Sequence, residues 1–321
     1  MKKVLYAAAM ALAIVAAVAV SGGRNISRTE FMFNTVITLK APDKGAVSAC
    51  FDEIARLEKL LSVYEEESEI SKINSAPSGT GVALSEETYN ILKKAEEYKK
   101  LTRGAFDITL KPVADLWNVK GEGYVPCDEE INLALTKKGD LVFDDETSTV
   151  TLTKEGMSID LGGIAKGYAA ERVTGILKER GVKRAVVDMG GNIAVIGKNG
   201  NDLWKVGLQH PTMQRGETFA LVFAENKFIV TSGGYERFFE RDGNRYHHIF
   251  DPETGKNPET DILSATVISK DGTLADALST AFFVMGKDRA LSLAEDLGVE
   301  AVIYTETGVF HTPSTEIELT Q

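Results

Sequence analysis

The sequence is poor in cysteine and histidine, the side chains that hold most structural metals. Its 321 residues include two cysteines, Cys50 and Cys127, whose spacing does not resemble a metal site. The two could pair in an oxidising compartment, although Cys50 stands at an apolar helical position that equally suits a buried thiol. Four histidines argue against a His-rich zinc site: His210, His247, His248 and His311.

Positive charge is also scarce. Lys and Arg number 36 against 47 Asp and Glu, which gives a net charge of −11. Because nucleic-acid phosphates are bound chiefly by Lys and Arg, no nucleic-acid partner is expected, and the acidic balance is explained by solubility. A composition of 43% hydrophobic and 26% charged residues is typical of a globular protein. No linker or repeat of fixed period divides the chain, so one compact domain over residues 24–321 is predicted.

A long hydrophobic run occurs at the N-terminus. Lys2 and Lys3 precede unbroken apolar residues 4–20, and Ser21, Gly22 and Gly23 follow. This pattern predicts an export signal over residues 1–23, with a small-residue cleavage site at 17–19. The run is also long enough for an uncleaved membrane anchor over residues 4–20. Cleavage would remove two positive charges and change the net charge from −11 to about −13. No cysteine follows the run, so a lipid-modified N-terminus is not expected.

The rest of the chain alternates between strand and helix patterns. Apolar residues recur at three and four over 47–64 and 85–104, which predicts amphipathic helices, the second with Ser85 as N-cap. Residues 118–139 are rich in Gly and Pro and are predicted to form a surface excursion, and alternation over 141–161 predicts antiparallel strands. The pattern predicts further strands at 35–40, 204–208, 218–223, 228–231, 264–268 and 301–304, a hairpin at 185–197, and helices at 164–180 and 273–286. This order predicts an α+β fold with antiparallel or mixed sheets.

Asp276 and Thr280 lie one turn apart on the last of these helices. A carboxylate and a hydroxyl at i and i+4 share one helix face, and together with a backbone carbonyl they suit a hard cation such as Mg²⁺. Thr273 and Asp276 also have the Thr-x-x-Asp form of a capping box. Spacing alone leaves both interpretations open.

Glycine pairs end three predicted strands, at 162–163, 190–191 and 233–234. Glycine allows a ligand to approach the backbone, and a following helix N-terminus favours an anion, although a pair can also simply form a turn. Neither the phosphate-loop nor the dinucleotide fingerprint is present. His247 and His248 precede an Asp-Pro turn. Adjacent histidines before a turn are often only a strand end, but a histidine held rigidly there near a metal-bound phosphate would suit a general base.

Several motifs in order resemble the FAD:protein FMN transferase family of the ApbE type. They cover most of the chain from Phe31 onwards and read SVYEEESEISKIN, GAFDITLKPVADLW, SIDLGGIAKGYAAERV, AVVDMGGNIAVIG, GLQHP, IVTSGGYERFF, HHIFDPETGKNP and TLADALSTAFFVMG. The resemblance implies an exported, Mg²⁺-dependent enzyme that moves FMN from FAD onto a Thr or Ser hydroxyl of a partner protein.

The resemblance also implies roles for individual residues. Asp276, Thr280 and the backbone carbonyl of Gly163 would bind Mg²⁺, and His248 would be the base. The FAD contacts it implies are Phe33, Tyr64, Ala105, Phe106, Asp107, Asp160, Lys166 and Ile249.

This sequence departs from the family pattern in two places. Phe33-Asn34-Thr35 stands where many members have Met-Gly-Thr, and Ser279 stands where some have a second carboxylate. The number of metal ions is therefore open.

Two other functions stay open beside FMN transfer. Water as the acceptor would give a Mg²⁺-dependent FAD pyrophosphatase that releases FMN and AMP, and a protein that leaves FAD intact would be an exported flavin-binding protein. The resemblance implies a location in the periplasm or on the outer face of the cell membrane, with a membrane or exported redox protein as acceptor.

Overall fold

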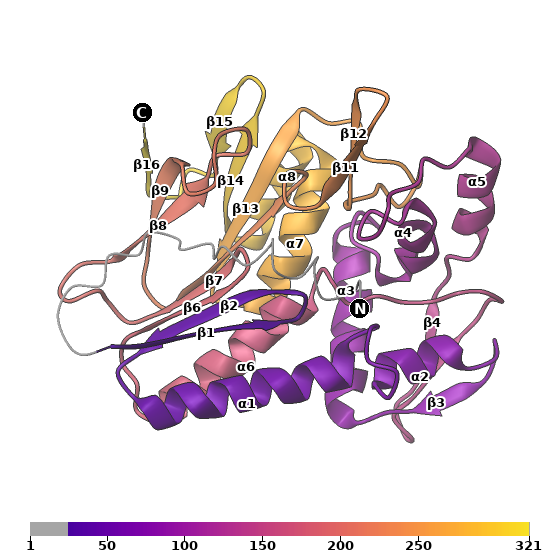
Figure 1. Ribbon diagram of the computed structural model, residues 1–321, viewed down its shortest axis with the longest axis horizontal. Coiled ribbons are helices and arrows are strands. Elements are labelled where there is room, and N and C mark those ends of the chain that lie inside the picture. The colour runs from indigo at the N-terminus through magenta and orange to yellow at the C-terminus, as the bar shows by residue number, and fades with distance from the viewer. Residues whose placement is uncertain (1–24, 321) are drawn as a thin grey trace, which may run out of the picture.

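An eight-stranded sheet, antiparallel at every step, runs through the molecule (Figure 1). The computed structural model describes residues 25–320, so the expected signal or anchor lies outside the described residues. In spatial order the strands are β1 (Ile26–Met32), β2 (Thr35–Ala41), β6 (Ala185–Met189), β7 (Asn192–Ile196), β10 (Lys227–Gly233), β13 (Ile262–Ser269), β14 (Glu300–Thr305) and β15 (Gly308–His311). The α+β class with antiparallel sheets is confirmed.

Three smaller sheets surround the large one. They contain β16 (Ile317–Leu319), β9 (Thr218–Ala224) and β8 (Trp204–Gln209); β3 (Gly81–Ala83), β5 (Thr149–Leu152) and β4 (Leu141–Asp144); and β11 (Phe238–Arg241) with β12 (Asn244–His247). The β8-β9-β16 sheet packs on one face of the large sheet through a buried cluster that includes Trp204 and Ile229. Alternate residues of the large sheet therefore face a second sheet.

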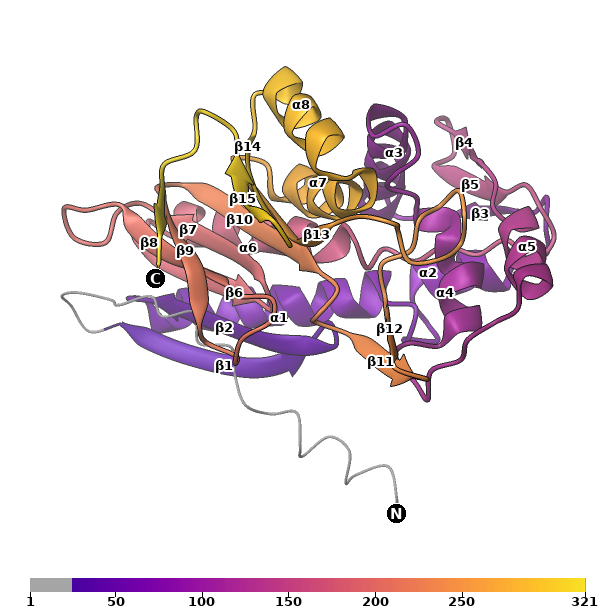
Figure 2. The ribbon, with the colours of Figure 1, turned by 90° about the horizontal axis from the view of Figure 1, so that it is seen from above.

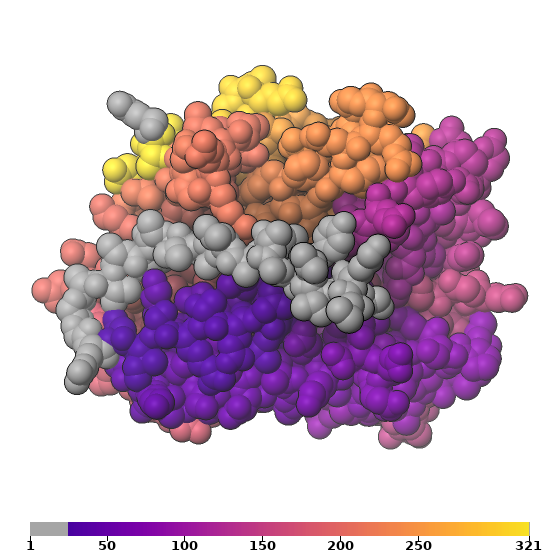
Figure 3. Space-filling model, viewed as in Figure 1, coloured from indigo at the N-terminus to yellow at the C-terminus, as the bar shows by residue number. Residues whose placement is uncertain are grey.

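Helices cover the opposite face of the large sheet (Figure 2). The helices on this face are α1 (Lys44–Leu61), α6 (Ala165–Glu179) and α7 (Gly272–Met285), with α8 (Lys287–Leu297) beside α7. The remaining helices are α2 (Glu69–Ser75), α3 (Glu86–Leu101), the 3₁₀ turn η1 (Ile108–Leu110), α4 (Lys111–Trp117) and α5 (Asp128–Thr136). Figure 3 shows indigo and purple N-terminal segments in the same body as salmon and orange segments from the second half of the chain. Because β2 pairs directly with β6, residues distant in sequence meet.

Local sequence explains where the first long helices begin. The Asp43 carboxylate accepts the Ala46 N–H at 2.6 Å and caps α1, and apolar positions spaced by three and four are buried along it. Ser85 accepts the Thr88 N–H at 3.3 Å, so the predicted cap of α3 is confirmed.

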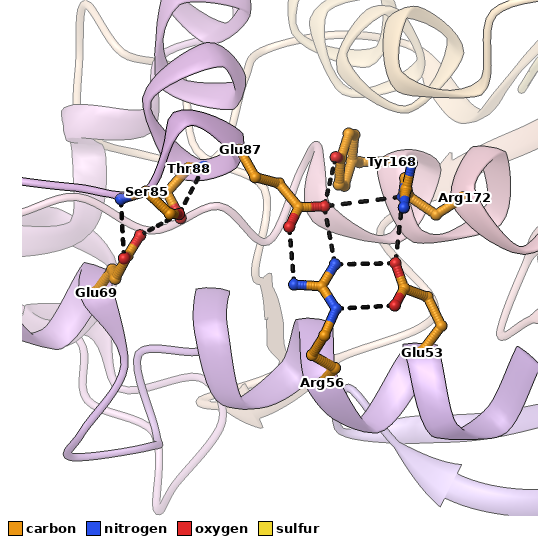
Figure 4. A network of polar contacts seen from close by, with 8 residues as sticks. All are labelled: Glu53, Arg56, Glu69, Ser85, Glu87, Thr88, Tyr168 and Arg172. Atoms are coloured by element: carbon orange, nitrogen blue, oxygen red, sulfur yellow. Dashed lines mark hydrogen bonds and ion pairs between the residues drawn. The ribbon is translucent and has the colours of Figure 1, made fainter. Parts of the chain in front are cut away.

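An ion-pair network joins α1, α3 and α6 (Figure 4). Arg56 donates to Glu53 at 2.8 Å and to Glu87 at 3.0 Å, while Arg172 donates to Glu53 at 3.2 Å and the Tyr168 hydroxyl donates to Glu87 at 2.7 Å. The hydrogen bond from Arg56 lowers the pKa of Glu53. Partly exposed pairs of this kind add modest stability, and here they connect three helices.

The structure corrects several expectations. Strand β1 precedes the strand expected to be first, and α5 lies within the stretch expected to be irregular, where the Glu130 side chain accepts the Cys127 N–H at 2.9 Å. Cys50 is buried and Cys127 is exposed, and both are free thiols, so the disulfide alternative is wrong. Within residues 25–320 no helix combines the length and hydropathy that a membrane span requires.

Candidate functional site

The N-terminal turn of α6 lies directly against α7. The Gly167 N–H donates to Asp276 Oδ2 at 2.8 Å, and Lys166 Nζ lies 3.7 Å from Asp276 Oδ1. A Cβ atom on Gly167 would lie 2.2 Å from the Gly272 carbonyl oxygen, so only glycine allows this approach. The buried Asp276 carboxylate is thereby fixed beside the Lys166 ammonium group.

Asp276 does not cap its own helix. The N-cap of α7 is Asp271, which accepts the Leu274 N–H at 2.7 Å. The capping-box interpretation of Thr273 and Asp276 is therefore wrong, because the helix begins two residues earlier than that pattern requires and Asp276 points to α6.

Thr280 lies one turn further along α7, next to Gly163. A Cβ atom on Gly163 would lie 3.4 Å from Thr280 Oγ1 and 3.1 Å from Phe106 Cε2. The Thr280 hydroxyl is 3.3 Å from Ser232 Oγ, which lies 2.8 Å from Ser279 Oγ. The structure thus brings Asp276, Thr280 and Gly163 together. Ser232, near the end of β10, was not among the site residues predicted from the sequence.

Residues 157–161, just before the glycine pair, form no strand, so the prediction of a strand up to residue 161 is wrong. Asn74 brackets this segment, since its side chain donates to the Ile159 carbonyl and accepts the Ile159 N–H, both at 2.8 Å. The Asp160 N–H donates to the Ile108 carbonyl at 3.0 Å, and Asp160 Oδ1 accepts the Gly162 N–H at 2.8 Å. Side chains and a 3₁₀ turn therefore satisfy the backbone in place of a neighbouring strand.

The oxygen atoms around Asp276 suit Mg²⁺. Among residues 25–320 no group of three His, Cys, Asp or Glu side chains could hold a metal. A carboxylate, the Thr280 hydroxyl and the Gly163 carbonyl are hard oxygen donors, and Mg²⁺ commonly keeps waters and substrate phosphates as its other ligands. The residues present therefore fit this ion.

The tip of the β1-β2 hairpin approaches His248 through Arg237. Phe33 and Asn34 form the tip with φ of 51° and 55°, and the Phe33 N–H donates to Glu58 Oε1 at 2.6 Å. Asn tolerates this left-handed conformation better than most residues other than glycine. Arg237 Nη2 donates to the Asn34 carbonyl at 2.8 Å, and the Arg237 carbonyl accepts the His248 N–H at 3.1 Å.

Both adjacent histidines are held neutral. Burial, followed by the positive charge of Arg237, lowers the pKa of His248 to about 3, and its Nδ1 lies 3.2 Å from the Arg237 carbonyl. This contact requires the tautomer with a proton on Nδ1, which leaves Nε2 as an acceptor. Burial also lowers the pKa of His247 to about 4, and its Nδ1 accepts the Ile249 N–H at 3.3 Å.

Lys120 links two of the expected FAD contacts. Its Nζ lies 5.3 Å from the centre of the Tyr64 ring and 3.7 Å from Asp160 Oδ2, and its charge contributes to the lowered pKa of His248. Tyr64 follows α1 and is 62% exposed, so its ring is accessible to a ligand. The sequence prediction missed Lys120 because it lies in the stretch expected to be a surface excursion.

Phe106 and Asp107, in the turn at residues 105–107, contact different parts of the structure. Phe106 packs against Gly163, whereas the buried Asp107 carboxylate accepts the Thr109 N–H at 2.9 Å and lies 3.4 Å from Lys99 Nζ. A cavity of about 760 Å³ is lined by Ala105 and Asp107 but not by the Asp276 group. The buried Ile249 has both backbone groups bonded internally, its carbonyl accepting from Asn257 at 2.8 Å.

Comparisons with known proteins agree on one family. The ApbE family profile matches residues 33–303. A protein of Klebsiella pneumoniae named FAD:protein FMN transferase is 33% identical over 294 residues, which cover 89% of this chain and 91% of the relative. A protein of Treponema pallidum with the same name is 33% identical over 306 residues and covers 87% and 84% of the two chains.

Solved structures show the same relationship. The crystal structure of the ApbE protein of Thermotoga maritima superposes with a TM-score of 0.84 at 35% identity and covers 91% of this chain and 98% of that one. The flavin transferase ApbE of Vibrio cholerae gives 0.81 at 26% identity, with the same coverage. The chain therefore belongs to the ApbE family, the family of the FAD:protein FMN transferases.

Proposed function

We propose that this protein transfers FMN from FAD to a Thr or Ser hydroxyl of an acceptor protein, with Mg²⁺, and releases AMP. The observation that carries the proposal is the meeting of Asp276 and Thr280 on α7 with Gly163 and Lys166 at the start of α6. Oxygen ligands for a hard cation, together with an ammonium group, suit the binding of a pyrophosphate. The names of the relatives support flavin as the group that is moved.

Asp276, Thr280 and the Gly163 carbonyl would hold the Mg²⁺. Bound there, the ion would neutralise negative charge on phosphate oxygens. Lys166 places a second positive charge at the same point and stabilises the charge that develops on departing AMP. Tyr64, which is 62% exposed, and Lys120 beside it are available for contact with the dinucleotide.

His248 is proposed to accept the proton of the acceptor hydroxyl. Its Nε2 has no hydrogen-bond partner within residues 25–320, and its low pKa keeps that nitrogen unprotonated at neutral pH. The hydroxyl oxygen forms a bond to the phosphorus on the FMN side, the bond from that phosphorus to the bridging oxygen breaks, and AMP leaves with the bridging oxygen. No enzyme nucleophile is required, so positioning and electrostatics supply the catalysis.

Mass spectrometry of a candidate acceptor mixed with this protein, FAD and Mg²⁺ tests the proposal. We expect one hydroxyl to gain FMN less one water, and AMP to appear in equal amount. Asp276→Ala is expected to abolish this transfer. Asp145→Ala removes a carboxylate that is 72% exposed and serves as the matched control. Rapid release of FMN and AMP without acceptor would show a pyrophosphatase, and intact FAD throughout would show a flavin-binding protein.

We also propose that the protein is exported and acts on a membrane or exported redox protein. The support is the sequence of residues 1–23, with two lysines ahead of an apolar run. Cell fractionation is expected to find the full chain in the exported fraction and a variant without residues 1–23 in the cytoplasm. Equal distribution of the two forms would contradict export.

A further inference from the structure

Asn192, the first residue of β7, has a buried side-chain amide that donates no hydrogen bond within the described residues. The residue is 3% exposed, and its Nδ2 finds no hydrogen-bond partner among residues 25–320. Buried polar groups are nearly always paired in native proteins, because an unpaired donor has lost its water without compensation. An orphaned amide at this position therefore indicates that a partner is missing.

The sheet register places this amide next to the Asp276 group. Asn192 pairs with Val230 of β10, and both side chains lie on the face that packs against the helices. The next residue of β10 on that face is Ser232, whose hydroxyl lies 3.3 Å from Thr280 Oγ1. Diagonal neighbours on adjacent strands are within reach of each other's side chains. Asn192 and Thr280 thus approach the same serine from two elements.

The turn before Asn192 is fixed, so the orphaned amide does not result from a loose loop. Gly190 and Gly191 have φ of 67° and 96°, and both N–H groups donate to Asp188 Oδ1, at 3.0 and 3.4 Å. A Cβ atom on Gly190 would lie 1.9 Å from Thr35 Oγ1, so the turn packs tightly against β2. The donor is therefore positioned before any ligand arrives.

We propose that the Asn192 amide donates to a phosphate oxygen of the dinucleotide. The inference rests on the proposed function, because FAD supplies the pyrophosphate. Thr280 and Lys166 define where the phosphates lie, and an amide donor on the opposite side of Ser232 would hold an oxygen that those two residues do not reach. Asn192 is a neutral donor and fits an anion without changing the charge of the site.

Asn192→Leu, a nearly isosteric apolar variant, tests the proposal through binding and stability. We expect FAD affinity, titrated by flavin fluorescence, to fall about tenfold or more, as for a lost hydrogen bond to a charged group. Riboflavin, which lacks phosphate, should bind as it does to the wild type. The ligand-free variant should melt at the wild-type temperature or above, because an unpaired donor has been removed from the interior.

Ser264→Ala provides the matched control. Ser264 Oγ is also buried and without a partner in the described part of the chain, but the residue pairs with Gly233 and Tyr304 on the face toward the β8-β9-β16 sheet. This variant should keep wild-type affinity for FAD. Unchanged FAD affinity in Asn192→Leu, an equal loss of FAD and riboflavin, or a lower melting temperature would overturn the inference. A wild-type protein that does not bind FAD would instead refute the proposed function, and this inference with it.

Discussion

Substitution of Gly167 by alanine tests the contact on which the site depends. Gly167 is in the first turn of α6, and the new methyl group would lie 2.2 Å from the Gly272 carbonyl oxygen and 2.7 Å from Asp276 Cβ. The first of these atoms is backbone, so rotation of a side chain cannot relieve the clash. The N-terminal ends of α6 and α7 must move apart.

The cost follows from two linked effects. Overpacking a close contact costs about 1–3 kcal/mol. The same movement stretches the 2.8 Å hydrogen bond from the Gly167 N–H to Asp276, and a hydrogen bond to a charged group is worth about 1.5–3 kcal/mol. Because both effects arise from one displacement, we expect a combined loss of about 2–4 kcal/mol in the free energy of unfolding.

Gly175→Ala on the same helix is the control. A Cβ atom there has nothing within 4 Å, so alanine should raise the free energy of unfolding by about 0.5–1 kcal/mol through its helix propensity. Urea unfolding of both variants measures the difference, and Mg²⁺-dependent turnover should fall only in Gly167→Ala. Wild-type stability in Gly167→Ala would refute the reasoning, because it would mean that the helices are not in contact at this point.

Three further predictions concern other parts of the molecule. The pKa of His248 lies at about 3 when folded against 6.5 ordinarily, so the unfolded state binds more protons between these values and stability falls as pH drops through that window; His248→Gln should reduce this slope in urea unfolding at pH 4–7 and leave the part due to His247, whose pKa is lowered to about 4. Glu171 accepts the Gly272 N–H at 2.8 Å, so Glu171→Ala should lose about 1–3 kcal/mol of unfolding free energy and Glu171→Gln less, and equal losses would contradict an acceptor role. Burial raises the pKa of Cys50 to about 12, so a thiol reagent should modify only Cys127 before unfolding; immediate modification of both would contradict the burial.

Local patterns were sufficient to locate the four longest helices, α1, α3, α6 and α7, and most strands, whereas the shorter α2, α4, α5 and α8 were not predicted. The spacing of apolar residues identified α1 and α3, and Ser85 identified the start of α3. The glycine pair at 190–191 identified the turn between β6 and β7. These features depend on residues that are close together in the sequence, so the sequence alone predicts them.

Only part of the candidate site could be predicted from the sequence. Asp276 and Thr280 were identified as a pair by their spacing, and the resemblance added Gly163 and His248. Lys120 was not identified, and neither was Asn192, whose only signal is an unpaired amide in the folded chain. Both residues are recognised by contacts between segments that are far apart in the sequence. The spacing of neighbouring residues does not predict such contacts.

The sequence by itself determined the periodicities of the helices and strands, the acidic balance and the family, because each is a property of residue order or of near neighbours. Tertiary structure alone decided that Asp276 receives a hydrogen bond from Gly167, 109 residues away, rather than capping its own helix. The reason is physical: Asp271 already caps α7, and the absence of a side chain at Gly167 lets α6 approach closely enough for its N–H to reach the carboxylate.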